Sequence, residues 1–342
     1  METVFVDGSS GEGGGQILRT SLALSCITGK SLHIEKIRAA RRNPGLAKQH
    51  LAAVQAACRI CNARDSGAVI GSTVLDFQPS QVQAGNFHFD IGSAGSATLV
   101  IQTILPVLFL ADKPSVVTVT GGTHNPWAPP FDFLRESFLP AIAAAGFQAN
   151  CRLIRHGFFP AGGGEITFEI QPLKAKQDQV IDICRPFKNP KIYARIYISK
   201  LPAHIAQHQE KLLLQSKLDI QNIEPIEVPG SAGPGNCVEI CICGDSRTII
   251  FTAFGMKGKP SEKVINEVVT LANDFLASGA AIDRFLADQL LIYMAISKAG
   301  SFTTNEISNH LQTNMEIIKK LLSVNFNIEQ QGKIYRISCG PY

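Results

Sequence analysis

One arrangement of turn, helix and strand recurs three times along this chain of 342 residues, and such a repeat strongly restricts the possible folds. Each copy opens at an aspartate, passes through a turn into a helix with a glutamine near its start, and continues into a strand. The aspartates are Asp7, Asp90 and Asp283, the glutamines are Gln16, Gln102 and Gln289, and the expected strands are residues 31–38, 115–120 and 301–304.

A second helix and further strand sequence complete each copy. Apolar positions predict these helices at residues 45–62, 130–145 and 313–323, and β-patterned sequence follows each of them. Each copy is therefore interpreted as a β-α-β-α-β-β unit. The predicted fold is α/β, with the three units forming a large domain.

About a hundred residues with a different pattern separate the second copy from the third. They contain an expected strand at 191–199, a helix at 203–217, further strands, and a helix at 261–277. This pattern predicts an inserted small α/β domain at residues 184–279. The large domain would then be formed by residues 1–183 and 280–342.

Composition narrows the class of protein. Hydrophobic residues make up 45% of the chain and charged residues 18%, while the net charge of +4 is too small for a histone-like binder. The sequence has no uninterrupted apolar run near twenty residues, so we expect no membrane-spanning helix. Nine cysteines, without the spacing of a disulfide framework, predict free thiols in a reducing cytoplasm.

The turn of the first copy is a candidate phosphate-binding site. Residues 8–19 read Gly-Ser-Ser-Gly-Glu-Gly-Gly-Gly-Gln-Ile-Leu-Arg and run directly into the first helix. Glycines allow backbone N–H groups to approach an anion, and the positive end of a helix favours it. Glu12 would repel a phosphate unless a metal or another cation lay between them. The alternative is an ordinary strand-to-helix turn with a capping glutamate.

A basic segment begins within the first copy's expected strand and extends beyond it. Five cations lie within thirteen residues, a density that suits phosphate binding, although a solvated cationic loop is the alternative. They are Lys36, Arg38, Arg41, Arg42 and Lys48.

A second glycine cluster, residues 157–164, follows His156 between two β-like stretches. Three consecutive glycines weaken a strand pair, so a ligand or another backbone is expected to approach closely there. The two motifs, His-Gly-x-x-Pro-x-Gly-Gly-Gly and Gly-Glu-Gly-Gly-Gly-Gln-Ile-Leu-Arg, resemble those of the RNA 3'-terminal phosphate cyclase family, in its catalytic branch. The resemblance covers essentially the whole chain, including the repeats and the insertion.

This resemblance implies an activity and its partners. In that family ATP adenylates a histidine near the C-terminus, and the AMP then moves to an RNA 3'-terminal phosphate. The neighbouring 2'-hydroxyl closes a 2',3'-cyclic phosphate and releases AMP. His310, within Ser-Asn-His-Leu-Gln-Thr, matches that histidine, and neutral imidazole can attack a phosphate without a separate base. The implied partners are ATP, Mg²⁺ or Mn²⁺, and RNA with a 3'-terminal phosphate.

Individual residues are also implied to act by the resemblance. The residues implied in catalysis are His310, Glu12, Arg19, Arg38, Arg41 and Asp288. Glu12 would in addition hold the metal ion against the phosphates. Asp288 would orient either His310 or the metal, and both possibilities stay open. Gln49 and His50 would support binding of the RNA phosphate.

A further set of residues is implied to bind ATP. It consists of Gln102, Pro129, Phe133, Phe285, Leu286, Ala287, Asp288 and Gln289. Phe285, Pro129 and Phe133 would enclose the adenine, and the amide of Gln289 would contact its edge. The alternative is that Phe133 and Phe285 are core aromatics and that Gln102 bonds across a helix interface.

Two other classes of function compete with this interpretation. A non-catalytic relative that binds pre-ribosomal RNA as an assembly factor would lack the nucleophile, so His310 and Glu12 argue against it. A small-molecule transferase of the enolpyruvyl type resembles this chain in its repeat architecture. Such an enzyme would need no histidine nucleophile and would use the basic segment for a small anionic substrate.

Overall fold

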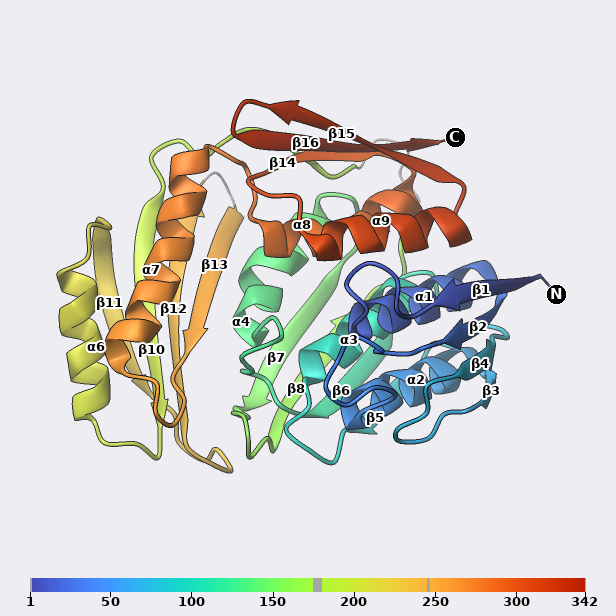
Figure 1. Cartoon of the computed structure of the whole chain (residues 1–342), viewed down its shortest axis with the longest axis horizontal. Coiled ribbons are helices and arrows are strands. Elements are labelled where there is room, and N and C mark those ends of the chain that lie inside the picture. Colours follow the sequence, from blue (N-terminus) through green and yellow to red (C-terminus); the bar gives the residue numbers. More distant parts are fainter. Residues whose placement is uncertain (1, 175–179, 245–246, 342) are drawn as a thin grey trace.

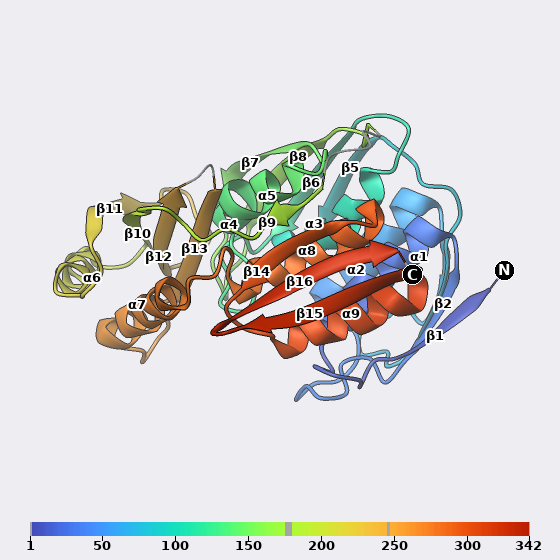
Figure 2. The ribbon, with the colours of Figure 1, turned by 90° about the horizontal axis from the view of Figure 1, so that it is seen from above.

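The computed structural model describes residues 2–174, 180–244 and 247–341, whose strands form four four-stranded sheets. Three sheets lie around a group of packed helices, and the fourth stands to one side with two helices of its own (Figures 1 and 2). The fold is mixed α/β, as the sequence predicts.

The first unit alternates strands and helices in the expected order. Its sheet has the strand order β1-β2-β4-β3, with β1 parallel to β2 and the other neighbours antiparallel. Apolar side chains alternate along β2, and they bury one face of the sheet against α1. The elements are β1 (Thr3–Asp7), α1 (Gly15–Thr28), β2 (Ser31–Glu35), α2 (Lys48–Cys61), β3 (Arg64–Ser66) and β4 (Leu75–Gln78).

The second unit repeats this topology. Its strand order is β5-β6-β8-β7, again with the first two strands parallel and the other neighbours antiparallel. The elements are β5 (Asn86–Asp90), α3 (Ala97–Leu108), β6 (Ser115–Gly121), α4 (Phe131–Phe133), η1 (Leu134–Phe138), α5 (Leu139–Ala143), β7 (Ala149–Arg155) and β8 (Gly164–Ile170).

The third unit has the same strand order and directions, but its first strand is separated from the rest in sequence. The short strand β9 pairs in parallel with β14, although the fourth sheet lies between them in the chain. The elements are β9 (Asp182–Ile183), α8 (Arg284–Ser297), β14 (Gly300–Thr304), α9 (Asn309–Leu321), β15 (Val324–Gln331) and β16 (Ile334–Pro341).

The fourth sheet is formed by the residues between β9 and α8. Its order is β11-β10-β12-β13, and α6 and α7 pack on it (Figure 1). The elements are β10 (Lys191–Ser199), α6 (His204–Leu214), β11 (Ile220–Glu227), β12 (Gly235–Gly244), β13 (Arg247–Phe254) and α7 (Ser261–Ser278). The division into domains at residues 184–279 stays a prediction that this arrangement supports.

The second helix of each unit differs from its expected bounds for a local reason. Gly45 has a φ of 80°, so α2 begins only at Lys48. The expected helix at 130–145 contains the π-helical turn η1, and Pro140 just after it lacks the N–H that an α-helix would use. Ser308 caps α9, which therefore begins at Asn309 and includes His310 in its first turn.

Helices from all three units form the centre of the molecule. Helix α1 contacts α3 and α9, and α8 contacts α9. Helix α3 is almost wholly buried, which explains its nearly continuous apolar sequence. In the part of the chain that the structure describes, no helix is both long enough and apolar enough to cross a membrane. The packing places the start of α1 beside the start of α9.

Candidate active site

The glycine-rich turn between β1 and α1 packs closely against the basic segment and against α9. Gly11 and Gly13 have φ values of 54° and 59°, in the left-handed region that glycine tolerates. A Cβ on Gly11 would lie 2.2 Å from Oγ1 of Thr313, and a Cβ on Gly13 would lie 2.8 Å from Cβ of Ala40. The turn thus joins the first unit to the third.

Glu12 lies at the centre of this contact, with only 10% of its side chain exposed. Its carboxylate pairs with the guanidinium of Arg41, and its Oε2 lies 3.7 Å from Nδ1 of His310. The backbone N–H of Glu12 donates to Oγ1 of Thr313 over 3.1 Å. Among the described residues, neither carboxylate oxygen accepts a regular hydrogen bond. Oε1 therefore faces a cation, and Oε2 faces the His310 ring.

His310 lies in the first turn of α9, beside Glu12. Its Nδ1 makes a short hydrogen bond with Oε1 of Gln16, a carbonyl oxygen that can only accept. Nδ1 therefore carries the ring proton, and Nε2 keeps its lone pair. Burial, and then the charges of Arg19 and Arg41, lower the pKa of His310 below its usual value, so the ring is neutral at pH 7.

Asp288 contacts the start of α9 through Ser308. The hydroxyl of Ser308 donates to Oδ1 of Asp288 over 2.8 Å and accepts from the N–H of Leu311 over 2.9 Å. The backbone carbonyl of Asp288 accepts from Nδ2 of Asn314 over 3.1 Å. Of the two roles expected for Asp288, these contacts support the orientation of His310.

The ionisation of Asp288 makes stability depend on pH. Burial raises its pKa to about 8, against 3.8 for a free side chain, although the hydrogen bond from Ser308 opposes this rise. The protonated group therefore favours folding at pH 4, and this contribution is lost as the pH rises to 8. We expect Asp288→Asn to increase the free energy of unfolding at pH 8 by roughly 2 to 5 kcal/mol and to change it little at pH 4. Denaturant unfolding measures both values, and an equal effect at the two pH values would contradict the prediction.

Three arginines supply the positive charge of the site. Burial lowers the pKa of Arg19 to about 10. The side chain of Arg19 lines a small cavity next to α8, which is described below. Arg38 donates to the carbonyl of Gly45 over 2.7 Å and so holds the basic segment in its fold. Arg41 is exposed and reaches Glu12. The structure therefore brings Arg19 and Arg41 to the site directly, while Arg38 supports the segment.

Gln49 and His50 are adjacent in α2 but face different neighbours. A Cβ on Gly15 would lie 2.3 Å from Nε2 of His50, so this ring forms the floor of the glycine turn. Burial, followed by the charges of nearby arginines, lowers the pKa of His50 to about 3. Oε1 of Gln49 accepts from the N–H of Ser96, the cap of α3, over 3.0 Å. Helix α2 therefore links the glycine turn to the second unit.

The repeated glutamines of the three units meet in one small cavity of about 40 Å³. Nε2 of Gln102 is buried without a hydrogen-bond partner among the described residues, so it is free to contact a ligand there. The polar residues that line the cavity are Gln16, Arg19, Thr20, Gln102, Asp288, Gln289 and Asn314. The recurrence visible in the sequence thus corresponds to a cluster at the centre of the three units.

The residues expected to contact adenine differ in accessibility. Phe285 is 41% exposed, and Pro129 is partly exposed. Phe133 is only 2% exposed, and Leu286 and Ala287 are also buried in the core. Cζ of Arg284 lies 4.8 Å from the centroid of the Phe285 ring, so a base can stack only on the other face of that ring. The side chains of Phe133, Leu286 and Ala287 support the site from inside. Enclosure of adenine by Phe133 would require its ring to become accessible.

Sequence reasoning missed several contacts that shape the site. Gln16 was noted only as a repeated glutamine, and its contact with His310 spans 294 residues. Ser308 could have been recognised, because serine two residues before His310 is a preferred N-cap. Thr313 binds Glu12 across 301 residues, and no sequence pattern indicates that contact.

The second glycine cluster forms the turn between β7 and β8. A Cβ on Gly157 would lie 2.4 Å from the backbone nitrogen of Gly164, so a close approach of backbone explains these glycines. The N–H of Gly157 donates to Oγ1 of Thr123 over 3.0 Å. The ring of His156 stacks on that of His124, with centroids 5.0 Å apart. The cluster therefore lies against the loop that precedes α4.

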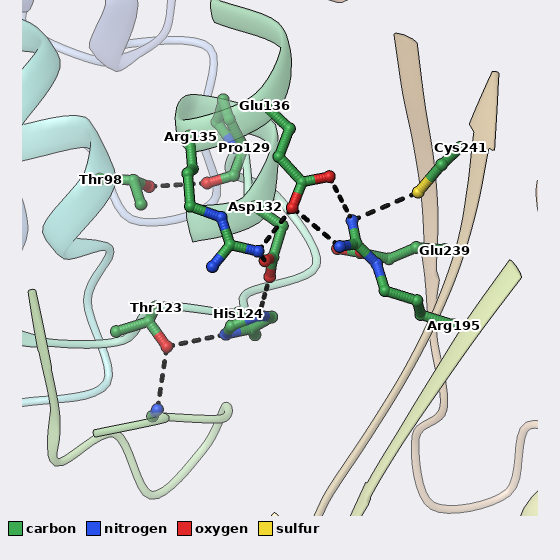
Figure 3. Close-up of polar contacts among 11 residues, drawn as sticks. Thr98, Thr123, His124, Pro129, Asp132, Arg135, Glu136, Arg195, Glu239 and Cys241 are labelled. Atoms are coloured by element: carbon green, nitrogen blue, oxygen red, sulfur yellow. Dashed lines mark hydrogen bonds and ion pairs between the residues drawn. The ribbon is translucent and has the colours of Figure 1, made fainter. Parts of the chain in front are cut away.

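An unexpected charge network joins this loop and η1 to the fourth sheet (Figure 3). Arg195 of β10 pairs with Glu136 over 2.8 Å and with the fully buried Glu239 of β12 over 2.9 Å. One side-chain nitrogen or oxygen atom from each of His124, Asp132 and Glu239 could bind a metal ion, since these atoms lie within 4.8 Å of one another. However, Arg195 already neutralises Glu239. We therefore interpret the group as a charge network and not as a metal site. The network consists of His124, Asp132, Arg135, Glu136, Arg195 and Glu239.

Comparisons with known proteins agree with the family resemblance that the two glycine-rich motifs indicate. A family model described as RNA 3'-terminal phosphate cyclase matches residues 10–328. A Koribacter versatilis protein named RNA 3'-terminal phosphate cyclase is 44% identical over 344 residues, covering 99% of this chain and 95% of the relative. A Pseudomonas fluorescens protein of the same name is 41% identical over 343 residues, covering 99% of this chain and 98% of the relative.

Proposed function

This chain belongs to the RNA 3'-terminal phosphate cyclase family, and we propose that it uses ATP to convert an RNA 3'-terminal phosphate into a 2',3'-cyclic phosphate. The observation that carries the proposal is the placement of His310. Its Nδ1 is held by Gln16, its Nε2 is unprotonated, and the glycine turn with Glu12 and Arg41 lies beside it.

This geometry supports covalent transfer of AMP as the first step of the proposed reaction. Nε2 of His310 attacks the α-phosphorus of ATP, and diphosphate leaves. The ring becomes positively charged, and Gln16 together with Oε2 of Glu12, 3.7 Å from Nδ1, stabilises that charge. A phosphate oxygen of the RNA end then attacks the same phosphorus, which forms RNA-(3')pp(5')A and restores His310. Finally the 2'-hydroxyl attacks the RNA phosphorus, loses its proton to solvent, and displaces AMP.

Because cleavage of ATP drives the formation of a phosphoric ester bond, this is a ligase reaction.

Positive charge and amides would hold the substrates during these steps. Arg19 and Arg41 would neutralise phosphate charge, and Arg38 would keep the basic segment in place. The free amide of Gln102 and the neighbouring Gln289 would contact the nucleotide. The exposed ring of Phe285 and the partly exposed Pro129 would flank its base.

Glu12 suits a divalent cation such as Mg²⁺ or Mn²⁺. Its two carboxylate oxygens are buried, and apart from the ion pair with Arg41 neither has a regular hydrogen bond with a described residue. Nucleotide-bound Mg²⁺ commonly takes one or two carboxylates together with phosphate oxygens. Such an ion would supply charge neutralisation between Glu12 and the phosphates, which would otherwise repel each other.

A cytoplasmic location is also part of the proposal. All nine cysteines are free, and the Sγ atoms of Cys26 and Cys61 lie 3.3 Å apart in the core without a disulfide. Unpaired thiols at such a distance persist in a reducing compartment.

Gly14→Ala tests whether the glycine turn needs its close contacts. The added Cβ would lie 2.2 Å from Oε1 of Glu12 and 2.6 Å from Nη2 of Arg41, so the ion pair would have to move. We expect cyclisation to slow by roughly 100-fold, because a shift of about 1 Å at a site has that effect. Gly340→Ala is the matched control, since no atom lies within 4 Å of its added Cβ. Equal rates of cyclisation in the two variants would show that the turn accommodates an added methyl group.

A direct assay of RNA products tests the proposed function itself. An oligonucleotide with a 3'-terminal phosphate, incubated with the protein, ATP and Mg²⁺, should yield a 2',3'-cyclic end and AMP. We expect Arg41→Met to slow this reaction by roughly 100- to 1,000-fold, because it removes a charge that stabilises the transition state. Arg64→Met on the exposed strand β3 is the control and should leave the rate unchanged. Absence of the cyclic product with the parent protein would overturn the proposal.

A further inference from the structure

Two large aromatic side chains stand exposed next to the second glycine cluster. Trp127 is 74% exposed and Phe159 is 46% exposed. Their rings lie edge to face, with centroids 5.5 Å apart and an interplanar angle of 79°. Trp127 precedes α4, and Phe159 lies in the turn between β7 and β8, at the lower edge of Figure 1. Much of both rings is therefore accessible to solvent.

The loops around this pair contain no acidic residue. Residues 91–96, 122–130, 157–163 and 229–235 consist of small, apolar and neutral polar side chains together with His124, and none is Asp or Glu. The loops also touch one another. A Cβ on Gly162 would lie 2.7 Å from Cα of Ala94, and a Cβ on Gly163 would lie 2.9 Å from Cβ of Ala232. They form one surface without acidic residues of its own, with the exposed Asp90 at its border, where it accepts from the N–H of Gly92 over 2.9 Å.

Three exposed cations border the same loops. Lys48 donates to the carbonyl of Gly92 over 3.1 Å, and Lys200 donates to the carbonyl of Ala232 over 3.3 Å. Arg155 donates to the carbonyl of Gly163 over 2.5 Å. Each cation therefore lies at a different edge of the surface. Lys48 and Lys200 can also reach a phosphate there, whereas Nη2 of Arg155 already lies 3.6 Å from Oε2 of Glu165 and would have to share its charge.

A chain of contacts connects this surface to the candidate active site. His50 lies under the glycine turn, and its neighbour Gln49 binds the N–H of Ser96 over 3.0 Å. The carbonyl of Ala94, two residues before Ser96, accepts from Nδ2 of Asn125 over 2.7 Å. Asn125 lies two residues before Trp127. These contacts thus link the loop that contains Trp127, through residues 94–96 and α2, to the glycine turn of the candidate active site.

We propose that Trp127 and Phe159 stack on bases of the single-stranded RNA that precedes the 3'-terminal phosphate, while Lys48, Arg155 and Lys200 contact its backbone. The inference rests on the proposed function, because the phosphate end must enter at Glu12 and His310. Exposed aromatic rings flanked by cations are typical of single-strand binding without sequence preference. A protein partner is the less favoured occupant, because the surface combines two rings with a border of cations and continues into the catalytic site.

Trp127 is the single tryptophan of the chain, so its fluorescence reports directly on stacking. We expect a ten-nucleotide oligouridylate with a 3'-phosphate to quench the emission on binding, and the same oligonucleotide without the phosphate to do so with weaker affinity. ATP alone should leave the emission unchanged. Absence of quenching by saturating oligonucleotide would overturn the proposal, and equal quenching by ATP alone would assign the ring to the nucleotide instead.

Kinetics provide a second measurement that does not depend on fluorescence. Phe159→Ala and Trp127→Ala should each raise KM for the ten-nucleotide substrate about tenfold, the loss expected for one stacked base, with kcat unchanged. A dinucleotide with a 3'-phosphate, which lacks the upstream bases that the pair would bind, should show no change. Trp127→Phe should restore most of the affinity. Phe5→Ala removes an aromatic ring that is 70% exposed elsewhere and serves as control.

The two proposals fail in different ways. If the chain does not cyclise RNA, no variant forms product, but the fluorescence titration still shows whether the oligonucleotide stacks on Trp127. If cyclisation proceeds and KM for the long substrate is the same in Phe159→Ala, Trp127→Ala and Phe5→Ala, the aromatic pair has no role in RNA binding. That result, with no quenching, would point to a protein as its partner.

Discussion

Replacing His310 by alanine is expected to abolish covalent attachment of AMP. The parent protein, incubated with α-labelled ATP and Mg²⁺, should retain acid-labile label, because a phosphorus–nitrogen bond to imidazole is hydrolysed in acid. His310→Ala should reduce the rate of labelling by a factor on the order of 10⁴ or more, as loss of a nucleophile does in other enzymes. The cause is specific, since Nε2 is the free nitrogen of a ring that Gln16 and Glu12 hold in place.

His33→Ala is the matched control for this experiment. His33 lies on β2 and pairs with Asp76 over 2.7 Å, away from the contacts of His310. It should be labelled like the parent. Label that persists in His310→Ala, in a protein with unchanged circular dichroism, would assign the nucleophile to another residue.

Arg195→Met is expected to produce the largest loss of stability. Its guanidinium is 15% exposed and pairs with Glu136 and with the fully buried Glu239 (Figure 3). Removing it leaves Glu239 as a buried carboxylate without its cation, and breaking such a pair costs roughly 3 to 5 kcal/mol. Burial already raises the pKa of Glu239, so the orphaned group would take up a proton and the loss should be greater at high pH than at low pH.

Two further variants separate this effect from loss of packing. Arg195→Met combined with Glu239→Gln removes both charges and should recover a large part of the lost free energy of unfolding. Arg152→Met breaks the exposed pair with Glu169, whose atoms lie 3.5 Å apart, and should change stability by less than about 0.5 kcal/mol. If Arg195→Met were no worse than Arg152→Met, the network would not hold the fourth sheet to the second unit. Denaturant unfolding at two pH values measures all of these changes.

Much of the fold was predictable because it repeats. The alternation of glycine turn, helix and strand is a local pattern, and the α/β class that it predicts is confirmed by the sheets of the structure. Boundaries were less predictable where single residues decide them. Gly45 delays α2, Ser308 advances α9, and Pro140 follows a π-helical turn, none of which changes the average hydrophobic pattern.

The family was predictable from two long motifs, and the comparisons confirm it. The roles of individual residues stay predictions that the structure supports to different degrees. Glu12, Arg41 and His310 lie together, whereas Phe133 is buried. Contacts such as His310 with Gln16 span most of the chain, and a single sequence contains no signal for pairs of that kind.

The pairing of β9 with β14 has a consequence for how the enzyme is made. Ser301 and Phe302 lie opposite Asp182 and Ile183, so the last sheet joins residues that leave the ribosome far apart in time. Formation of this sheet therefore has to wait until both segments have been synthesised, and His310, the proposed nucleophile, lies in the later segment. Because the glycine turn and the start of α1 contact Thr313 and His310 of α9, a chain that ends before α9 would lack part of the candidate site.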